Sequence, residues 1–362
     1  MFKFIKYFIF KLIYGKVTQV IKPQNSKKII LKKVPFANSN IYNFYSIPKG
    51  RVYSDTVNNT AYILDDFLIK DASYQYKLKK NLQTINGNIF NNFVIKHGTP
   101  KILKEIKRSV FSLLSGGAAK NSYWHWIFDV LPKIGILEKL NLRHKPDYYL
   151  LPSLKRKYQI ETLLNLKIPE KKLLDGEKYK HIKCDNLLTV DHPYVFKNNP
   201  SKSIVNIPIW IIKWLRKKYV KSKSSKSNYS KKIYIDREDD SILENRRIIN
   251  NKEVKNLLIN LGFRIVSLSN YSFKDQIKMF NNAKLVVGLH GSGFANLVFS
   301  KPRTKVIELS SKYSGNAVHY LAKKCQLNYN KIVDSSSQSI KHQDNPVMID
   351  LEKLKKLILS FK

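Results

Sequence analysis

The most regular hydrophobic pattern lies in the second half of the chain, after residue 230. Short apolar runs alternate there with segments in which apolar residues recur every three or four positions, which predicts strands alternating with helices. The predicted strands are 231–235, 263–268, 284–289 and 305–309, and the predicted helices are 250–261, 272–282 and 315–325. Because short loops join them, we expect right-handed βαβ units and a doubly wound parallel sheet.

The first half has a less regular pattern and reads as mixed α and β. Apolar runs at 60–69 and 146–152 alternate with a helical pattern at 133–142, and residues 204–219 read as a helix. The domain boundaries that follow are an N-terminal domain at 1–216, a linker at 217–232, a C-terminal domain at 233–345 and a final amphipathic helix at 346–362. The linker is rich in Ser and Lys and has no apolar period.

The run "KLVVGLHGSGFANLVF" places His290 at the carboxyl end of a predicted strand, where the ligand crevice of a parallel sheet forms. Gly291 and Gly293 would let the backbone turn sharply. A helix beginning near Phe294 would point free N–H groups and its positive dipole end at an anion such as a pyrophosphate. Glu308 ends the next strand and could accept hydrogen bonds from ribose hydroxyls. The alternative is a turn histidine and a surface glutamate.

A second candidate site lies in "GGAAKNSYWHWIFDVLPKIGIL", residues 116–137. His125 and Asp129 are four residues apart, so on a helix the carboxylate can orient the imidazole as a general base requires. Pro132 should end or kink this helix. The alternative is a surface His–Asp pair without a catalytic role. The helix would bury a stripe formed by Trp124, Ile127, Phe128 and Leu131.

A third motif, "YIDREDDSILENRRIIN", follows the predicted strand 231–235. Arg237 lies at the carboxyl end of that strand, and Arg246 follows one loop later; arginine side chains suit diphosphate oxygens. The carboxylates between 236 and 240 could instead bind a metal, although Arg237 would compete for the same oxygens. A metal-dependent transferase therefore stays open as an alternative.

Composition adds a strong positive charge to this picture. The chain has 362 residues, 43% of them hydrophobic, and 66 basic against 26 acidic residues give a formal charge of +40. A basic polyanion-binding protein that binds nucleic acid is the alternative that this charge raises. The lysines are spread along the whole chain, without an RNP signature or zinc knuckle, so a solvated lysine-rich surface is the favoured explanation and no nucleic-acid partner is expected. A positive field favours anionic ligands in either case.

The cysteines and the N-terminus bear on the cellular compartment. Cys184 and Cys325 are too few for a disulfide framework, so we expect a reducing environment. Residues 1–17, "MFKFIKYFIFKLIYGKV", are too short and too charged to span a bilayer. Their mixture of Phe, Ile, Tyr and Lys suits a helix on an anionic membrane surface, with a plain amphipathic helix or strand as the alternative.

The motifs "NSYWHWIFDVLPKI", "YIDRE", "LGFRIV", "SFKDQIKMFNNAKLVVGLHGSGFANLVF" and "KVIELS", in this order, resemble glycosyltransferase family 61, which includes bacterial capsule-type transferases and eukaryotic xylosyl- and N-acetylglucosaminyltransferases. The resemblance covers about residues 116–310. It implies a GT-B-like α/β fold, with two Rossmann-like domains facing across a cleft, and an inverting mechanism. It implies a nucleotide-sugar donor, expected to be UDP-linked, and no bound metal or other cofactor.

The expected reaction transfers a sugar to a hydroxyl of a growing glycan or lipid-linked glycan, as in bacterial cell-surface polysaccharide synthesis. The catalytic candidates are His125 and Asp129, with Asp129 acting directly as the second choice for the base. Lacking the membrane anchor of secretory-pathway members, the chain is expected to be cytoplasmic or peripheral on the inner membrane face. The donor-binding candidates are Arg237, Arg246, Asn250, His290, Gly291, Ser292, Gly293, Asn296 and Glu308.

Overall fold

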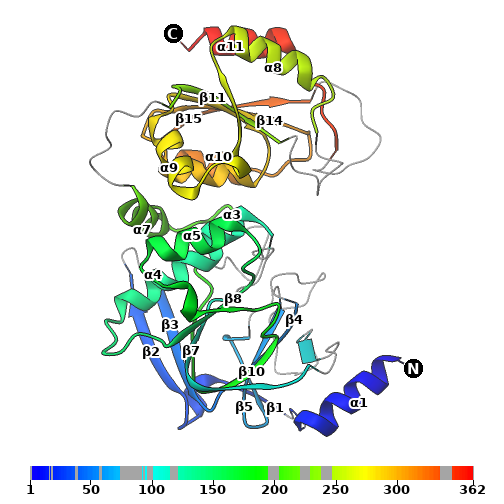
Figure 1. Cartoon of the computed structure of the whole chain (residues 1–362), viewed down its shortest axis with the longest axis vertical. Coiled ribbons are helices and arrows are strands. Elements are labelled where there is room, and N and C mark those ends of the chain that lie inside the picture. The colour runs from blue at the N-terminus through cyan, green and yellow to red at the C-terminus, as the bar shows by residue number, and fades with distance from the viewer. Residues whose placement is uncertain are drawn as a thin grey trace. The chain divides into compact units, whose positions relative to one another are not determined.

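The structure is a computed structural model, in which the chain forms two compact units, residues 1–211 (unit 1) and 212–362 (unit 2). Figure 1 shows the path of the chain through them. The structure describes residues 2–15, 17, 19–36, 40–56, 59–73, 92, 94–95, 101–114, 121–194, 204–220, 229–237, 247–334 and 345–361. The mixed α/β character that the sequence predicts is confirmed.

Unit 1 is built on one mixed sheet of ten strands within its described residues. The strands β10, β7, β8 and β9 are neighbours in this order and run parallel, while β3, β4 and β5 pair antiparallel with their neighbours. The strands are β1 (Gln19–Ile21), β2 (Ile30–Pro35), β3 (Ile41–Pro48), β4 (Arg51–Thr56), β5 (Asn59–Leu64), β6 (Phe67–Ile69), β7 (Lys104–Ser112), β8 (Tyr148–Leu151), β9 (Leu173–Asp175) and β10 (His181–Val190).

This strand pairing differs from the Rossmann-like sheet expected for the first domain. The connections between β2 and β6 are only a few residues long, and such short connections join antiparallel strands because a parallel pair needs a crossover of a dozen residues or more. Only the later strands of the unit are separated by helices. Unit 1 therefore combines an antiparallel meander with a parallel α/β part.

The predicted helix at residues 123–139 is present and changes its winding partway. It consists of α3 (Tyr123–His125), a π-helical turn η3 (Trp126–Val130) and α4 (Leu131–Lys139). All four residues of the predicted apolar stripe are buried. Of the two effects expected at Pro132, an end of the helix is wrong, because Pro132 lies in the first turn of α4, where a missing N–H is tolerated. A kink stays a prediction.

Three further helical segments of unit 1 are short. They are η1 (Pro23–Asn25), α5 (Lys157–Asn165) and η4 (Glu170–Lys172). In Figure 1, α4 and α5 lie together on one side of the strands. The Trp126 indole N–H donates to the Thr162 hydroxyl of α5 at 2.9 Å, which ties the π turn to that helix.

Helix α4 carries a lysine on its buried side. Lys133 is 4% exposed, and its Nζ donates to the backbone oxygen of Leu114 at 2.6 Å. Burial lowers the pKa of Lys133 to about 7, although the nearby charges of Asp191 and Asp129 favour the protonated form. An ammonium group in this position is stabilised by neighbouring carboxylates and opposed by desolvation.

Unit 2 contains the parallel sheet that the sequence predicts. Its order is β12-β11-β13-β14-β15, and every neighbouring pair is parallel. The pattern predicted four of the five strands within a residue or two and missed β15, in which polar and apolar residues are mixed. The strands are β11 (Lys232–Asp236), β12 (Arg264–Ser267), β13 (Leu285–Leu289), β14 (Lys305–Ser310) and β15 (Asn328–Val333).

Helices cover both faces of this sheet. Figure 1 shows α8 and α11 on one face and α9 and α10 on the other, which is the doubly wound arrangement. The predicted C-terminal helix is confirmed as α11, whose Leu354 and Ile358 are buried in the unit 2 core. The helical elements are α8 (Asn251–Asn260), η5 (Leu268–Asn270), α9 (Phe273–Asn282), η6 (Ser292–Phe299), α10 (Ala317–Lys324) and α11 (Leu351–Leu359).

The chain passes from unit 1 to unit 2 within helix α7 (Ile209–Tyr219). Trp210 packs in unit 1, where its indole N–H donates to the Tyr42 hydroxyl at 2.8 Å. Arg216 belongs to unit 2, where its guanidinium donates to the backbone oxygens of Val298 and Ser300. Unit 2 therefore begins before the expected boundary at 216, and residues 221–228 of the proposed linker lie outside the described residues.

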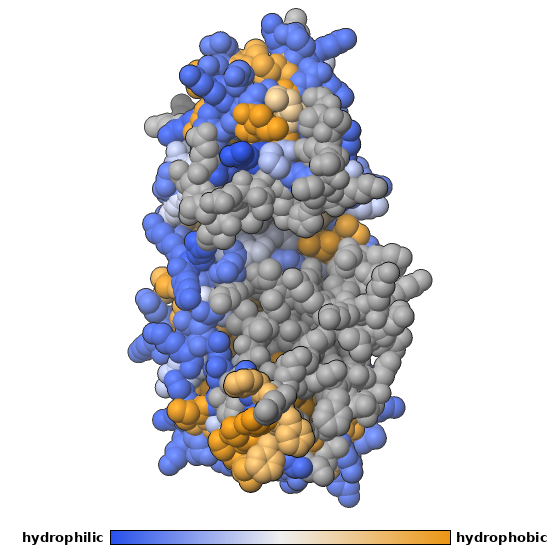
Figure 2. Space-filling model, turned by 90° about the vertical axis from the view of Figure 1, so that its right-hand side faces the viewer, coloured by the Kyte–Doolittle hydropathy of each residue, from blue (hydrophilic) through white to orange (hydrophobic). Residues whose placement is uncertain are grey.

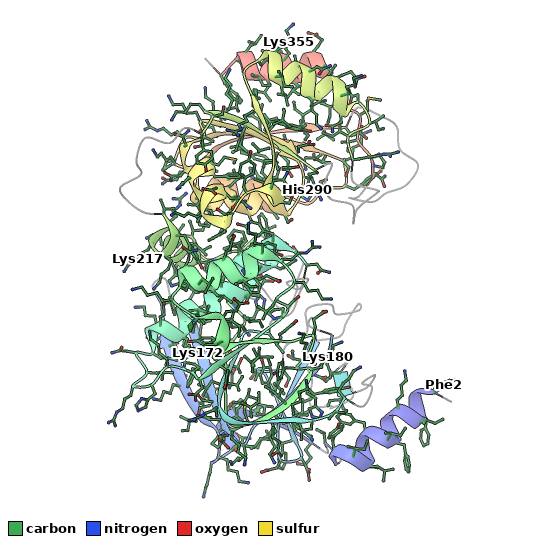
Figure 3. The ribbon with its side chains drawn as sticks, in the orientation of Figure 1. Phe2, Lys172, Lys180, Lys217, His290 and Lys355 are labelled. Atoms are coloured by element: carbon green, nitrogen blue, oxygen red, sulfur yellow. The ribbon has the colours of Figure 1, made fainter. Side chains whose placement is uncertain are left out.

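Helix α1 (Phe2–Tyr14) presents apolar side chains to solvent. Phe10 is buried against Tyr53, with ring centroids 5.0 Å apart, and anchors the helix to unit 1. Figure 2 shows apolar side chains gathered at the lower end of the molecule, and Figure 3 labels Phe2 at the free end of α1. Among the described helices, none has the length and apolar character needed to cross a membrane. The exposed apolar side chains of α1 are Phe2, Phe4, Ile5, Phe8, Ile9, Leu12 and Ile13.

Lys133→Met should remove a pH dependence of the free energy of unfolding. Above about pH 7 the folded state releases the Lys133 proton, whereas the unfolded state keeps it up to about pH 10.5. The unfolded state then binds more protons, so wild-type stability rises with pH in this window and is lowest below it. We expect the difference in unfolding free energy, Lys133→Met minus wild type, to fall as the pH rises from about 7 to 10.5, by up to about 1.4 kcal/mol per pH unit.

The measurement is urea unfolding of both proteins at several pH values between 6 and 10. Lys139→Met is the matched control, since Lys139 is exposed on the same helix. A difference for Lys133→Met that stays constant with pH would contradict the lowered pKa.

Candidate functional site

The first candidate site lies where two neighbouring strands of unit 2 end. The strand order reverses between β11 and β13, since the chain moves from β11 to β12 on one side and returns to β13 on the other. Ligands of open parallel sheets bind outside the carboxyl ends of the strands at such a switch point. Arg237 follows β11 directly and His290 follows β13, so the sheet brings these two predicted residues together.

Arg237 is held by the backbone at this edge. Its Nη1 donates to the backbone oxygen of His290 at 2.9 Å. A Cβ on Gly291 would lie 2.5 Å from the same Nη1, so only glycine leaves room for the guanidinium. The sharp turn expected at Gly291 is wrong, because its φ of 170° is extended backbone that any residue adopts. The glycine is needed for the close approach of Arg237.

His290 is oriented by a buried carboxylate. Its Nδ1 is hydrogen-bonded to Oε1 of Glu308, and the Tyr329 hydroxyl donates to Oε2 of the same residue. Glu308 is fully buried, and both of its oxygens are engaged. The expected ribose contact does not fit this arrangement, because both Glu308 oxygens are engaged, and Glu308 instead positions the His290 imidazole. Burial, and then the Glu308 charge, raise the pKa of Tyr329.

The segment after His290 forms η6, a 3₁₀-helix that begins at Ser292. The first N–H groups of such a helix have no intrahelical acceptor and carry partial positive charge, so this end suits an anion. Asn296 is not part of this surface, because it is fully buried and its Nδ2 donates to Oε1 of Gln276 at 2.9 Å. A Cβ on Gly293 would meet Leu268 at 3.0 Å, which makes this glycine a packing requirement.

Two other predicted donor residues are not brought to the switch point. Asn250 precedes α8 and bonds twice to the backbone of Ile349, donating from Nδ2 at 2.8 Å and accepting from the N–H at 3.0 Å. It anchors the C-terminal segment, so its donor role is corrected to a structural one. Arg246 lies outside the described residues, as do Glu238, Asp239 and Asp240 of the acidic cluster.

The described part of the acidic cluster is Asp236, which has its own partners. Its Oδ2 forms an ion pair with Lys255 at 2.7 Å, and its Oδ1 accepts from the Arg237 backbone N–H at 2.9 Å. Within the described ranges, no three His, Cys, Asp or Glu side chains are grouped so that they could hold a metal ion. Cys184 and Cys325 are free and buried.

The second candidate site lies in unit 1, on the π turn. His125 Nδ1 and Asp129 Oδ2 are 2.7 Å apart, which confirms the pairing that their spacing predicts. Asp129 is fully buried and His125 is 9% exposed, so the alternative of a surface pair is wrong. The π turn widens the helix at this position, and such turns recur at functional sites.

Two residues that the sequence did not single out complete this site. The Tyr194 hydroxyl donates to Asp129 Oδ1 at 2.5 Å, and His192 Nε2 lies 3.7 Å from Asp129 Oδ2. Both follow β10 in the run "DHPY", residues 191–194. Polar residues directly after an apolar strand were the signal that could have found them, but β10 had not been predicted as a strand.

The segment 191–194 is itself fixed to the strands. The Tyr45 hydroxyl donates to Asp191 Oδ1 at 2.5 Å, and the Asn43 backbone N–H donates to Oδ2 at 2.7 Å. Burial raises the pKa of Asp191, and these hydrogen bonds oppose the shift. His192 and Tyr194 are thereby held beside Asp129.

The electrostatics of Asp129 favour its ionised form. Burial alone would raise its pKa, but the charges and hydrogen bonds of His125 and His192 outweigh burial and lower it. An ionised Asp129 accepts from His125 Nδ1–H and so fixes the tautomer in which Nε2 carries the lone pair. The arrangement can accept a proton from a hydroxyl and stabilise the resulting imidazolium.

Comparison with known proteins bears on both sites. The sequence model of the family described as Glycosyltransferase 61 matches residues 123–307, just over half of the 362 residues. This range begins at α3, beside His125, and ends next to Glu308, so it contains His125, Asp129, Arg237 and His290. No curated protein matches the sequence. The chain therefore belongs to glycosyltransferase family 61 and is a glycosyltransferase.

Proposed function

We propose that this glycosyltransferase uses a nucleotide-sugar donor and inverts the configuration at the anomeric carbon as it transfers the sugar to a glycan hydroxyl. The acceptor is a growing cell-surface polysaccharide, as the resemblance to capsule-type members suggests. The observation that carries the donor assignment is the pair Arg237 and His290 at the switch point of the unit 2 sheet. Diphosphates suit such a position because backbone N–H groups and a guanidinium converge there.

The donor diphosphate is the leaving group, and negative charge grows on its terminal phosphate as the glycosidic bond breaks. In the proposal, Arg237 and the N-terminus of η6 stabilise this charge, and His290, held in place by Glu308, contributes a hydrogen bond to the phosphate. These groups supply positive charge, so the proposal assigns no metal ion, and turnover should survive a chelator.

The acceptor hydroxyl needs a base, for which we propose His125 with Asp129 as its orienting carboxylate. Nε2 of His125 takes the hydroxyl proton as the oxygen attacks the anomeric carbon from the face opposite the diphosphate. The proposed base belongs to unit 1, and the proposed leaving-group contacts belong to unit 2. Direct action by Asp129 fits less well, because the carboxylate is fully buried and engaged by His125 and Tyr194.

We further propose that α1 attaches the enzyme to an anionic membrane surface on the cytoplasmic side. Seven apolar side chains of α1 are exposed, and the same helix carries Lys6 and Lys11. Apolar insertion combined with attraction of lysines to acidic headgroups is how interfacial helices bind.

Donor binding can be tested without an acceptor. A nucleoside diphosphate at 100 times its dissociation constant should stabilise the protein by about 2.7 kcal/mol. Arg237→Ala should weaken binding about 10- to 100-fold, since a charge-assisted hydrogen bond to phosphate is lost. Gly291→Ala should weaken it a few-fold, because the new Cβ displaces the guanidinium from its position 2.5 Å away.

Isothermal titration and thermal unfolding measure these effects. Arg143→Ala is the matched control, because Arg143 is exposed and lies in unit 1. The donor assignment fails if no common nucleoside diphosphate shifts the unfolding temperature at millimolar concentration.

The proposed base can be separated from a packing role. His125→Ala should lower turnover by about two to four orders of magnitude, with donor affinity within a few-fold of wild type. Asp129→Asn should cost less, because the imidazole stays in place. Turnover and unfolding temperature are measured on the same preparations, with exposed His144→Ala as the control. A stable and fully active His125→Ala protein would end the proposal.

Membrane attachment can be tested with Phe4→Asp, Phe8→Asp and Leu12→Asp combined. These side chains lie four residues apart on one exposed face, 52–76% exposed, and Phe10 still anchors the helix. Sedimentation with anionic vesicles should fall at least tenfold because three apolar side chains no longer insert. Ile102→Asp is the control, being 85% exposed outside α1. Unchanged sedimentation would show that α1 does not bind the membrane.

A further inference from the structure

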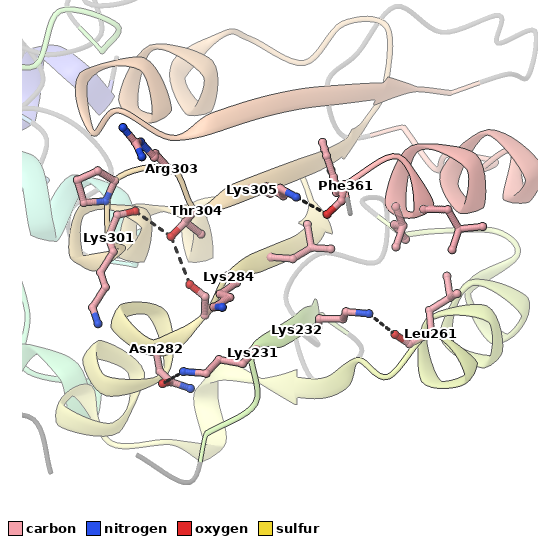
Figure 4. A pocket seen from close by; sticks show the side chains of 15 residues that line it. Lys231, Lys232, Leu261, Asn282, Lys284, Lys301, Arg303, Thr304, Lys305 and Phe361 are labelled. Carbon is pink, nitrogen blue, oxygen red and sulfur yellow. Dashed lines mark hydrogen bonds between the residues drawn. The ribbon is translucent and has the colours of Figure 1, made fainter. Parts of the chain in front are cut away.

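A second concave site lies in unit 2, at the end of the sheet opposite to the switch point. It is a groove of about 700 Å³, formed where β11, β13 and β14 begin and where α8, α9 and α11 end. Figure 4 shows it from close by. Its volume is in the range of pockets that hold small-molecule ligands. The proposed donor reaction does not use this groove.

Six basic side chains line the groove, and on the described part of the chain none of them forms an ion pair with a carboxylate. Three donate to uncharged acceptors: Lys231 to Asn282, Lys232 to the Leu261 backbone, and Lys305 to the Phe361 backbone. These hydrogen bonds position the ammonium groups without neutralising them. The other three are Lys284, Lys301 and Arg303, all exposed.

Between the cations the wall is apolar. Its side chains come from the last turn of α11 and the segment after it, from the residue after α8, from the start of β13 and from the turn before β14. Leu359 is 49% exposed and is therefore open to a ligand, whereas Leu285 and Ile358 are 5% exposed and form the floor behind it. The apolar residues that form the wall are Leu261, Leu285, Pro302, Ile358, Leu359 and Phe361.

We infer that this groove binds a phosphate group attached to an apolar chain, that is, a lipid phosphate. Six neighbouring positive charges create a potential that favours an anion, and phosphate accepts from several ammonium and guanidinium donors at once. The apolar wall adds affinity only for a ligand that carries an apolar part beside its charge. Free inorganic phosphate and a nucleic-acid backbone use the cations but leave the wall exposed to water.

The site is tested with octyl, decyl and dodecyl phosphate below their micelle-forming concentrations, using the full chain and isothermal titration. Saturable binding is expected, with affinity rising up to about fourfold for each added methylene, the equivalent of ~0.8 kcal/mol per buried CH₂. Lys284→Ala, Lys301→Ala and Arg303→Ala combined should weaken binding at least tenfold. Leu359→Asn should flatten the dependence on chain length.

The matched control combines Lys252→Ala, Lys274→Ala and Lys353→Ala, which remove the same charge from exposed lysines in the first turns of α8, α9 and α11. It should change affinity less than threefold, and α1 and the donor site are intact in both triple variants. The proposal would be overturned if the two triple variants lost the same affinity for alkyl phosphates, or if affinity did not depend on chain length. It would also be overturned if alkyl phosphates did not bind and the groove triple variant lost binding to an oligonucleotide.

The source of the lipid phosphate is distinguished by sedimentation with phosphatidylglycerol vesicles. Loss of vesicle binding in the groove triple, relative to the control triple, would identify a bilayer phospholipid. Vesicle binding that is equal in both triples, together with saturable binding of dodecyl phosphate, would identify a free lipid phosphate. If neither vesicles nor alkyl phosphates distinguish the two triples, the inference is wrong.

Discussion

A buried carboxylate must be compensated by charge and hydrogen bonds, and both candidate sites of this protein are built on that constraint. Asp129 in unit 1 and Glu308 in unit 2 are fully buried, and each meets a histidine Nδ1 with one oxygen and a tyrosine hydroxyl with the other. In each case the carboxylate fixes the orientation of the imidazole. In the proposed reaction the histidine meets the substrate, and the carboxylate acts through the histidine.

The same histidine–carboxylate pairing is proposed to serve opposite ends of one reaction. At Asp129 the pair is proposed to receive a proton from an attacking hydroxyl, while at Glu308 it is proposed to hold a hydrogen-bond donor towards a departing phosphate. The difference lies in the surroundings of the two histidines. His290 is accompanied by Arg237 and the start of η6, which favour an anion. His125 has the buried Asp129 and a second histidine, His192, near it.

The parallel sheet of unit 2 separates the two proposed anion sites by the direction of its strands. At the carboxyl ends of the strands, the backbone N–H groups at the start of η6 are electropositive. The Arg237 guanidinium lies against Gly291 at the same end, where the glycine leaves room for it. At their amino ends the cations are side chains, and an apolar wall lies between them. A sheet whose strands all point one way gives its two ends different chemistry. This supports separate ligands for the switch point and the groove.

The hydrophobic pattern was sufficient for four of the five strands of unit 2, which are short apolar runs, and for its longer helices, each of which buries one face. It was not sufficient for β15, in which polar and apolar residues are mixed. Spacing was sufficient for the His125–Asp129 pair, since a helix brings residues four apart together. Only the tertiary structure could decide which polar residues face a ligand. Glu308, Asn250 and Asn296 have the chemistry of donor contacts but are turned to partners distant in sequence, and Tyr194, Tyr329 and Lys133 become important only through such partners. Local patterns determine which segments form strands and helices, whereas the compensation of buried polar groups depends on contacts between segments that the sequence does not place side by side.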